Sequence, residues 1–498
     1  MTVLSTLVAP RSPRGGSRRT VLLGLLAVAL IVLGVVAWHS FIAPLSGYGD
    51  QPHDLDVVRK ADPRALSGGD LTTFHPGFRP FSQAAYNLPW KLQAEFDTGD
   101  ALFDANFKPG PTIDPARVRG GLGPMFNQSS CSGCHFRDGS ASPPASPGEA
   151  MNGMFLRISV PDGLGGWKPM DGYNTQIHDQ AVNGVPPEGK GRVTYTEQPG
   201  RYPDGSVYSL RRPHYQLENS RFGPVPADAV VEARVAPRNF GGGLLEAIPE
   251  NAILEVARQQ AASGTGVHGR PNRVVDVVTG KTVLGRFAWK ANNPTVIQQA
   301  ADAFSNDMGL TTKLFPQQNC PVGQAACLTE AARQSSDVHE VNDAELDAMS
   351  TYLRLLAVPA RRAVNDPNAL RGEQLFHQVQ CMQCHVDTFR TGDSHPVRRL
   401  RDQIIHPYTD LLLHDMGEGL SGRPDHLAGP RDWRTAPLWG VGLTEKVNRH
   451  TNFLHDGRAR NLEEAVLWHG GEAEGARQRF MQLSAEDRRL LLYFLGTL

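Results

Sequence analysis

A five-residue pattern with the chemistry of haem attachment, Cys-x-x-Cys-His, occurs twice in this chain. The two copies are Cys131-Ser-Gly-Cys134-His135 and Cys381-Met-Gln-Cys384-His385. Two thiols at this spacing can form thioethers with the vinyl groups of one porphyrin, and the adjacent His can then ligate its iron. A dithiol redox motif does not need the trailing His, and a zinc site needs a second ligand pair nearby. The repeated pattern therefore predicts two covalently attached haem c groups, with His135 and His385 as iron ligands.

The two remaining cysteines, Cys320 and Cys327, are close enough in sequence to form a disulfide. No His or third Cys stands beside them, so a metal site is not indicated. In an oxidising compartment we expect a disulfide that closes this loop. In a cytosolic chain the same residues would be two free, buried thiols.

The amino-terminal segment indicates where the chain resides. Val21–Trp38 is an apolar run without a charge, and several arginines but no acidic residue precede it. Its length suits a membrane span, and the arginines favour a cytoplasmic amino terminus. We therefore expect a cytoplasmic basic segment (1–20), an uncleaved transmembrane signal anchor (21–38) and a juxtamembrane segment (39–90). The alternative is a removed signal peptide. In either case the body lies in the periplasm, held to the inner membrane if the anchor is retained.

Composition is that of an ordinary globular protein with room for several domains. The 498 residues are 40% hydrophobic and 20% charged, and the formal net charge is -1. Such a charge balance argues against nucleic acid as a partner.

A second repeat surrounds the two Cys-x-x-Cys-His motifs. The pattern Leu-x-x-x-Phe-x-x-Gly-x-x-Leu-Phe in residues 92–107 predicts a helix before the first motif, and Leu370–Phe376 repeats its end before the second. This recurrence predicts two related cytochrome c-like domains, at 91–360 and 361–498. Strand-like alternation in 154–160 and 207–217 predicts a β-rich insertion at about 154–236. The expected fold class is thus mainly α, with this insertion in the first domain.

Three further helices are predicted from local signals. Asn342 can cap a helix over 343–357, Ser484 can cap a final helix that reaches Leu495, and residues 246–261 follow a glycine break with a helical pattern.

Two longer segments resemble a known family. Gly121-Leu-Gly-Pro-Met-Phe-Asn127 and the stretch from Leu454 to Ala473 look like those of the di-haem oxidoreductases, a family described as peroxidases and also labelled thiol oxidoreductases. The resemblance covers the chain from about residue 50 to its end. More distantly, the chain is similar to bacterial di-haem cytochrome c peroxidases and to a di-haem enzyme that matures a tryptophylquinone cofactor. The resemblance implies a peroxide-reacting haem in the first domain and an electron-transfer haem in the second.

The resemblance also implies three catalytic residues. Trp289, Gln299 and Asp307 match a Trp, a Gln and an acid of these relatives, although the acid is Asp rather than Glu and stands two residues earlier. Trp289 would lie between the haems, Gln299 would donate a hydrogen bond in the pocket, and Asp307 would be the acid/base. A carboxylate near the iron can move the proton that peroxide cleavage requires.

At the positions of the second ligand of each haem iron, this chain differs from the relatives. For the second haem, His469 occupies the position at which relatives carry Met or Tyr, and Met416 is the competing ligand. For the first haem, the region after the motif has no His until His178, so its iron would be open, or weakly ligated by Met151 or Met154. An open position is what chemistry on a small molecule requires.

These features predict a di-haem redox enzyme that takes electrons at the second haem and reacts with hydrogen peroxide at the first. The alternatives are an electron-transfer cytochrome without its own catalysis and an oxidase that acts on a protein partner. We expect a periplasmic electron donor or acceptor protein as partner. Relatives also carry calcium between their haem domains, so the resemblance implies calcium, although the sequence shows no distinct loop for it. The thiol oxidoreductase label finds no support, because all six cysteines have other expected roles.

Overall fold

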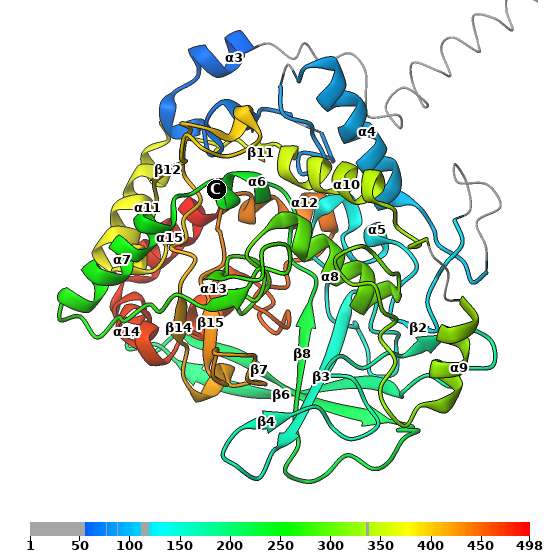
Figure 1. Cartoon of the computed structure of the whole chain (residues 1–498). Coiled ribbons are helices and arrows are strands. Elements are labelled where there is room, and N and C mark those ends of the chain that lie inside the picture. The colour runs from blue at the N-terminus through cyan, green and yellow to red at the C-terminus, as the bar shows by residue number, and fades with distance from the viewer. Residues whose placement is uncertain (1–54, 76, 87, 111–118, 335–337) are drawn as a thin grey trace, which may run out of the picture. The chain divides into compact units, whose positions relative to one another are not determined.

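The computed structural model describes residues 55–75, 77–86, 88–110, 119–334 and 338–498. Figure 1 shows helices interspersed with many short strands. The structure is 34% helical and 18% strand, so the expected mainly α fold class is wrong and the fold is mixed. Most of the sheets pair only two or three residues of each strand. A ladder this short has no periodicity that a sequence pattern could reveal.

The helices are α3 (Leu55–Lys60), α4 (Trp90–Asp104), α5 (Cys131–Cys134), α6 (Gly242–Glu246), α7 (Glu250–Ala262), α8 (Val296–Met308), α9 (Ala325–Gln334), α10 (Asp343–Leu355), α11 (Pro367–Gln378), α12 (Thr444–Asn448), α13 (Leu462–Leu467), α14 (Glu474–Gln482) and α15 (Ala485–Thr497). The strands are β1 (Thr72–Thr73), β2 (Met125–Phe126), β3 (Met154–Pro161), β4 (Trp167–Lys168), β5 (Gln180–Ala181), β6 (Lys190–Arg201), β7 (Val207–Glu218), β8 (Val230–Val235), β9 (Arg273–Val275), β10 (Thr282–Leu284), β11 (Val358–Pro359), β12 (Phe389–Arg390), β13 (Ile404–Ile405), β14 (Leu413–Asp415) and β15 (Asp432–Arg434).

The helices with clear local signals form where the sequence predicts them. Asn342 caps α10 in a capping box with Glu345, and the Ser484 hydroxyl accepts a hydrogen bond from the Asp487 amide at the start of α15. The helix expected over 246–261 forms as α7, which begins only at Glu250 because Pro249 is its N-cap; the residues before it form the separate short helix α6.

The first motif lies beside a crossing of two helices, α4 and α10 (Figure 1). Gly99 of α4 allows this contact, because a Cβ there would come within 2.5 Å of the Tyr352 Cβ atom on α10. Phe103 follows one turn later and contacts both the Tyr352 ring, at 5.4 Å between centroids, and the His135 ring, at 6.2 Å. The crossing thus positions an aromatic pair against the His of the first motif.

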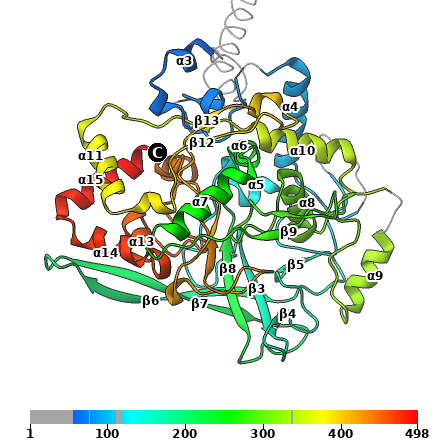
Figure 2. The same ribbon diagram turned by 60° about the vertical axis from the view of Figure 1, so that its left-hand side comes forward.

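The second motif repeats this arrangement with α11 and α15, which lie side by side in Figures 1 and 2. A Cβ at Gly372 would lie 2.7 Å from the Phe494 Cβ atom and closer still to the Leu490 carbonyl oxygen. Phe376 then contacts Phe494 at 5.5 Å and His385 at 6.4 Å between ring centroids. The same spacing of Gly and Leu-Phe therefore occurs at both motifs and accompanies the same kind of helix crossing.

Replacing Gly372 with Ala is expected to destabilise the protein. The added methyl group would overlap the α15 backbone, and overpacking of this kind costs roughly 1–3 kcal/mol of unfolding free energy. Gly496→Ala is the matched control, since a Cβ there meets nothing within 4 Å and lies in the same crossing helix, α15. The control should be stabilised by about 0.5–1 kcal/mol through helix propensity. Denaturant unfolding of both variants measures the difference, and equal stabilities would refute the close approach.

The long strands occupy residues 154–235. β3 pairs antiparallel with β8 over six residues and also with β4, while β6 and β7 form a hairpin of twelve paired positions each. Figure 2 shows this hairpin as a long ribbon beside α13 and α14. At its tip, the Tyr202 hydroxyl donates to Glu463 (2.7 Å) and Asp204 accepts from Arg488 (2.6 Å). The hairpin therefore contacts α13 and α15, the latter a helix of the crossing at the second motif.

Residues 54–498 form one compact unit. The predicted transmembrane segment, 21–38, lies outside the described residues. In the part of the chain that is described, no helix is long and apolar enough to cross a membrane.

Candidate functional site

Both Cys-x-x-Cys-His motifs open into one cavity of about 650 Å³. Its wall carries the expected catalytic residues, both motifs and the two candidate ligands of the second haem: Cys131, Cys134, His135, Trp289, Gln299, Asp307, Cys381, Cys384, His385, Met416 and His469. Tertiary structure thus brings together residues from across more than three hundred positions of the chain.

The first motif forms a single helical turn, α5, capped by Ser130, which accepts from the Gly133 amide. The Nδ1 of His135 donates to the Pro237 carbonyl oxygen at 2.7 Å, which orients the ring. Burial lowers the pKa of His135 to about 4, which keeps the ring neutral. A neutral imidazole held through Nδ1 is the form that ligates metals.

The second motif has the same geometry. The Nδ1 of His385 donates to the Tyr408 carbonyl oxygen at 2.9 Å, and burial lowers its pKa to about 4. The His469 ring lies 6.5 Å from the His385 ring, measured between centroids. Its Nδ1 also donates to a carbonyl, that of Ala465, at 2.7 Å. Two imidazoles that share one metal, at about 2 Å from each nitrogen, have ring centres about 6 Å apart. The pair therefore fits a single iron between His385 and His469.

The competing ligands are placed differently. Met416 lines the cavity near Trp468 and Trp433 but no described contact joins it to His385. Met151 and Met154 pack in the core against Leu156 and lie outside the cavity wall. Among the described residues of that wall, no second imidazole is paired with His135.

Asp307 is held beside the first motif by the backbone. Its carbonyl oxygen accepts from the Asn127 and Gln128 amides, just before Cys131. The segment before the first motif and the end of α8 approach closely here, because a Cβ at Gly123 would overlap the backbone of Gly309. Gly309 ends α8 in a left-handed conformation (φ 61°). The segment that resembles the family thus has a physical role, since only glycine permits this approach.

A carboxyl, an amide and a guanidinium form a chain at this site. Gln176 Nε2 donates to Asp307 Oδ1 at 2.7 Å, and Arg157 Nη2 donates to Gln176 Oε1 at 3.1 Å. Burial raises the pKa of Asp307 to about 6, although the Gln176 hydrogen bond opposes the shift. Gln299, by contrast, accepts from Asn293 (3.2 Å) and does not contact Asp307.

The sequence reasoning missed Arg157 and Gln176. Phe155 and Arg157 of β3 face the cavity, whereas Met154, Leu156 and Ile158 pack in the core. This alternation was a usable signal, because a charged residue on the opposite face of a buried strand needs a polar environment.

Trp289 lies on the cavity wall, where its indole N–H donates to the Val235 carbonyl oxygen at 2.8 Å. The His455 ring approaches it edge-on at 6.5 Å, and His455 in turn stacks on Trp433 at 3.6 Å between centroids. Burial lowers the pKa of His455 to about 3, so this ring is neutral. A continuous aromatic row therefore extends from Trp289 along the cavity.

The neighbouring Lys290 is fully buried. Its ammonium donates to the carbonyl oxygens of Gly429 (2.8 Å), Pro430 (3.2 Å) and Asp432 (2.8 Å) and lies 4.1 Å from the Trp433 ring centre. This cation joins the segment that carries Trp289 to β15, and burial lowers its pKa to about 8.

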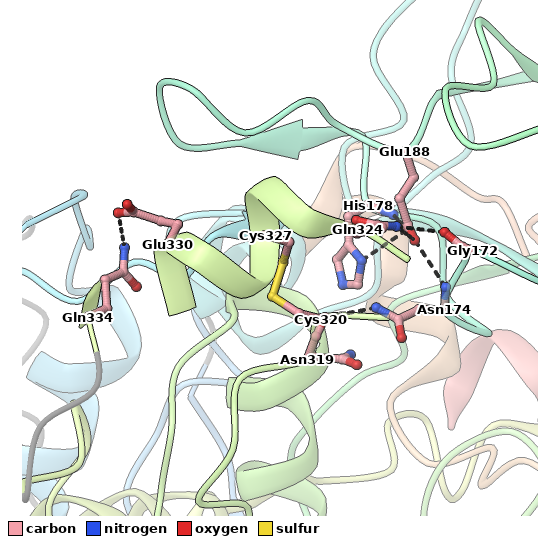
Figure 3. Close-up of a disulfide and its surroundings, with 10 residues drawn as sticks. All are labelled: Gly172, Asn174, His178, Glu188, Asn319, Cys320, Gln324, Cys327, Glu330 and Gln334. Atoms are coloured by element: carbon pink, nitrogen blue, oxygen red, sulfur yellow. Dashed lines mark hydrogen bonds and ion pairs between the residues drawn. A yellow bond between two sulfur atoms is a disulfide. The ribbon is translucent and has the colours of Figure 1, made fainter. Parts of the chain in front are cut away.

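The disulfide expected between Cys320 and Cys327 is present (Figure 3). The loop that this disulfide closes is hydrogen-bonded to residues next to Asp307 and His178. Asn319 Nδ2 donates to Asn306 Oδ1 at 2.7 Å, next to Asp307, and Gln324 Nε2 donates to Glu188 at 2.9 Å.

The calcium implied by the resemblance stays a prediction. Among the described residues, one group of His, Cys and acidic side chains converges closely enough for an ion: Cys384, Asp410 and His414. His414 is already hydrogen-bonded to Asp410 and Glu472, each at 2.8 Å. This group does not fit calcium, which takes six to eight oxygen ligands.

Comparison with known proteins agrees with this donor set. The family model described as "Di-haem oxidoreductase, putative peroxidase" matches residues 63–498. No curated protein matches the chain. A solved structure of hydrazine synthase from Kuenenia stuttgartiensis is 18% identical over 31% of this chain and 55% of that chain, but its TM-score of 0.21 is too low to carry an argument. Two free Cys pairs and two carbonyl-held imidazoles in one cavity fit two haems. The chain belongs to the di-haem oxidoreductase family.

Proposed function

We propose that this oxidoreductase is a c-type di-haem enzyme that reduces hydrogen peroxide at its first motif with electrons received at its second. Cys131 and Cys134 would bind one haem with His135 as ligand, and Cys381 and Cys384 the other with His385. When bound, the haems supply redox-active iron. The reaction converts one hydrogen peroxide, two electrons and two protons into two water molecules, and a reduced electron-transfer protein outside the cytoplasm supplies the electrons.

The observation that carries this proposal is the asymmetry of the two motifs. The His385 and His469 rings lie 6.5 Å apart between centroids, so both residues would hold the second haem, which would then supply electron transfer alone. The first motif instead shares its surroundings with Asp307, Gln176 and Arg157, which are groups for proton transfer and charge stabilisation.

Asp307 would move the proton. Above its pKa of about 6 the carboxyl is ionised, and its Oδ1 is already engaged by Gln176. Oδ2 is then the atom that takes a proton from one peroxide oxygen and returns it to the other. The guanidinium of Arg157 would stabilise the negative charge that develops on the departing oxygen, and burial strengthens this interaction.

Trp289 would lie on the electron path between the two motifs. It lines the cavity that both motifs share, and its hydrogen bond to Val235 holds the indole in one orientation. An aromatic ring at this position shortens the distance over which an electron must pass. We place the protein in the periplasm, which the Cys320–Cys327 disulfide supports. The membrane anchor at 21–38 stays a prediction.

Electron paramagnetic resonance of the purified ferric protein, before and after peroxide, tests the proposal. We expect one high-spin and one low-spin signal, and peroxide should abolish the high-spin signal. Two low-spin signals that peroxide does not change, in both the oxidised and the half-reduced protein, would contradict the proposal. They would favour an electron-transfer cytochrome without its own catalysis. Loss of the high-spin signal without turnover of peroxide would instead favour an oxidase of a protein partner.

His469→Met is expected to raise the midpoint potential of the second haem, because a thioether ligand favours ferrous iron more than imidazole does. Met416→Leu is the matched control and should leave this potential unchanged. Spectroelectrochemical titration measures both. The reverse outcome, with Met416→Leu shifting the potential and His469→Met leaving it alone, would assign the ligand to Met416.

A further inference from the structure

Four arginines on the cavity wall have no carboxylate partner among the described residues. Arg479 is exposed and donates to the Val379 carbonyl oxygen at 3.1 Å, whereas Arg238, Arg286 and Arg434 are less exposed. Each guanidinium is instead hydrogen-bonded to neutral oxygens. Arg238 donates to the Pro437 carbonyl (2.9 Å) and the Thr444 hydroxyl (3.3 Å).

The other two are held in the same way. Arg286 Nη1 donates to the Leu245 carbonyl oxygen at 3.0 Å. Arg434 donates through Nε to the Ala288 carbonyl (2.9 Å) and through Nη1 to that of Thr435 (3.1 Å). Elsewhere on the same wall, Arg157 and Arg234 both pair with Asp425. Arg238, Arg286 and Arg434 thus differ from these two paired arginines of the same wall.

All three lie where the segments around the two motifs meet. Arg238 follows Pro237, whose carbonyl holds His135, and reaches residues of the carboxy-terminal part. Arg434 reaches back in the other direction, since its backbone amide donates to the Trp289 carbonyl at 2.9 Å. Arg286 begins the short segment that leads to Trp289.

A buried guanidinium without a counter-charge is costly, and proteins normally pair it. Burial lowers the pKa of each of the three to about 10; Glu246 and Glu250 near Arg286 and Asp410 near Arg434 oppose the shift only in part. Arginine binds carboxylates in particular, because its planar donors match two carboxylate oxygens. The cavity therefore lacks an anion that a carboxylate-bearing ligand would supply.

We infer that Arg238, Arg286 and Arg434 bind the propionate carboxylates of the two haems and so direct both sets of propionates toward Trp289. This inference rests on the two haems of the proposed function but not on peroxide as substrate. The carbonyl hydrogen bonds orient each guanidinium before binding, and the carboxylates neutralise three positive charges that the fold alone leaves unpaired.

Arg434→Gln in the haem-loaded protein tests the inference by spectroelectrochemical titration. Removing a positive charge beside a propionate stabilises the ferric iron, so at least one midpoint potential should shift to more negative values. Arg434→Lys should restore most of the shift. Arg192→Gln is the control, because Arg192 lies outside the cavity wall and pairs with Glu218 on the hairpin.

Potentials in Arg434→Gln that equal those of Arg192→Gln, with both haems in place, would overturn the inference. If the variant does not fold, a crystal structure of the unmodified haem-loaded protein decides the matter. It must show the guanidinium groups on propionates, and contacts to carbonyl oxygens alone would contradict the inference. The peroxide experiment can fail while these outcomes hold, so the two proposals are tested separately.

Discussion

Asp307→Asn should lower the rate of reaction with hydrogen peroxide by about 10²–10⁴-fold, the usual contribution of a positioned acid/base. Asn has the same shape and can still accept the Gln176 hydrogen bond through Oδ1, but it cannot carry the proton. Stopped-flow absorbance of the ferric protein mixed with peroxide measures the rate.

The pH dependence of this rate identifies the group. Burial raises the pKa of Asp307 to about 6, so the ionised fraction increases between about pH 5 and pH 7. The wild-type rate should rise over this range, because the carboxylate form accepts the proton. In Asp307→Asn the rise should disappear.

Asp302→Asn is a matched control on the same helix and the same cavity wall. Burial also raises the pKa of Asp302, but its oxygens are held by Asn293 (3.0 Å) and Asn306 (2.7 Å). The rate should change much less than in Asp307→Asn. A larger loss in Asp302→Asn, or a wild-type rate and pH profile in Asp307→Asn, would assign the proton transfer to another group.

The double variant Cys381→Ser/Cys384→Ser should contain one covalent haem in place of two. Each thiol pair attaches one macrocycle, and Ser cannot form the thioether. Haem absorbance per polypeptide should fall by half, and the mass of the intact chain should fall by that of one haem. Peroxide turnover with a protein electron donor should be lost.

Cys131→Ser/Cys134→Ser is the companion variant. It should lose the same amount of haem, but it should retain the low-spin signal assigned to His385 and His469 and lose the peroxide-sensitive one. A third variant, Cys320→Ser/Cys327→Ser, should keep both haems, because its cysteines form the disulfide. Unchanged haem content in either motif variant would refute covalent attachment at that motif.

Much of the local structure could be predicted from short-range signals. The caps at Asn342 and Ser484 satisfy amides within three residues, so they act before any tertiary contact forms. The repeated Gly and Leu-Phe spacing likewise predicted helices at both motifs. What it could not reveal was that Gly99 and Gly372 mark two equivalent helix crossings, because the partners α10 and α15 are far along the chain.

The fold class was wrong for a related reason. Strand β1 pairs with β11 through Thr72 with Val358 and Thr73 with Pro359, far apart in sequence. Two residues carry no alternation, so only the folded chain determines that they form a ladder. Alternation in 154–160 and 207–217 did predict β3 and β7, whereas β6 and β8 carried no prediction of their own within the expected β-rich insertion.

The candidate site divides along the same line. The sequence by itself predicted the chemistry: two Cys-x-x-Cys-His motifs and a disulfide pair from spacing along a few residues, and Trp289 and Asp307 from the family resemblance. Only the tertiary structure decided the asymmetry. It placed His469 opposite His385, joined Arg157 to Asp307 through Gln176, and left Arg238, Arg286 and Arg434 on the cavity wall without a carboxylate partner among the described residues. Those relations are distances and charges between elements far apart in sequence, and they exist only once packing brings the elements together.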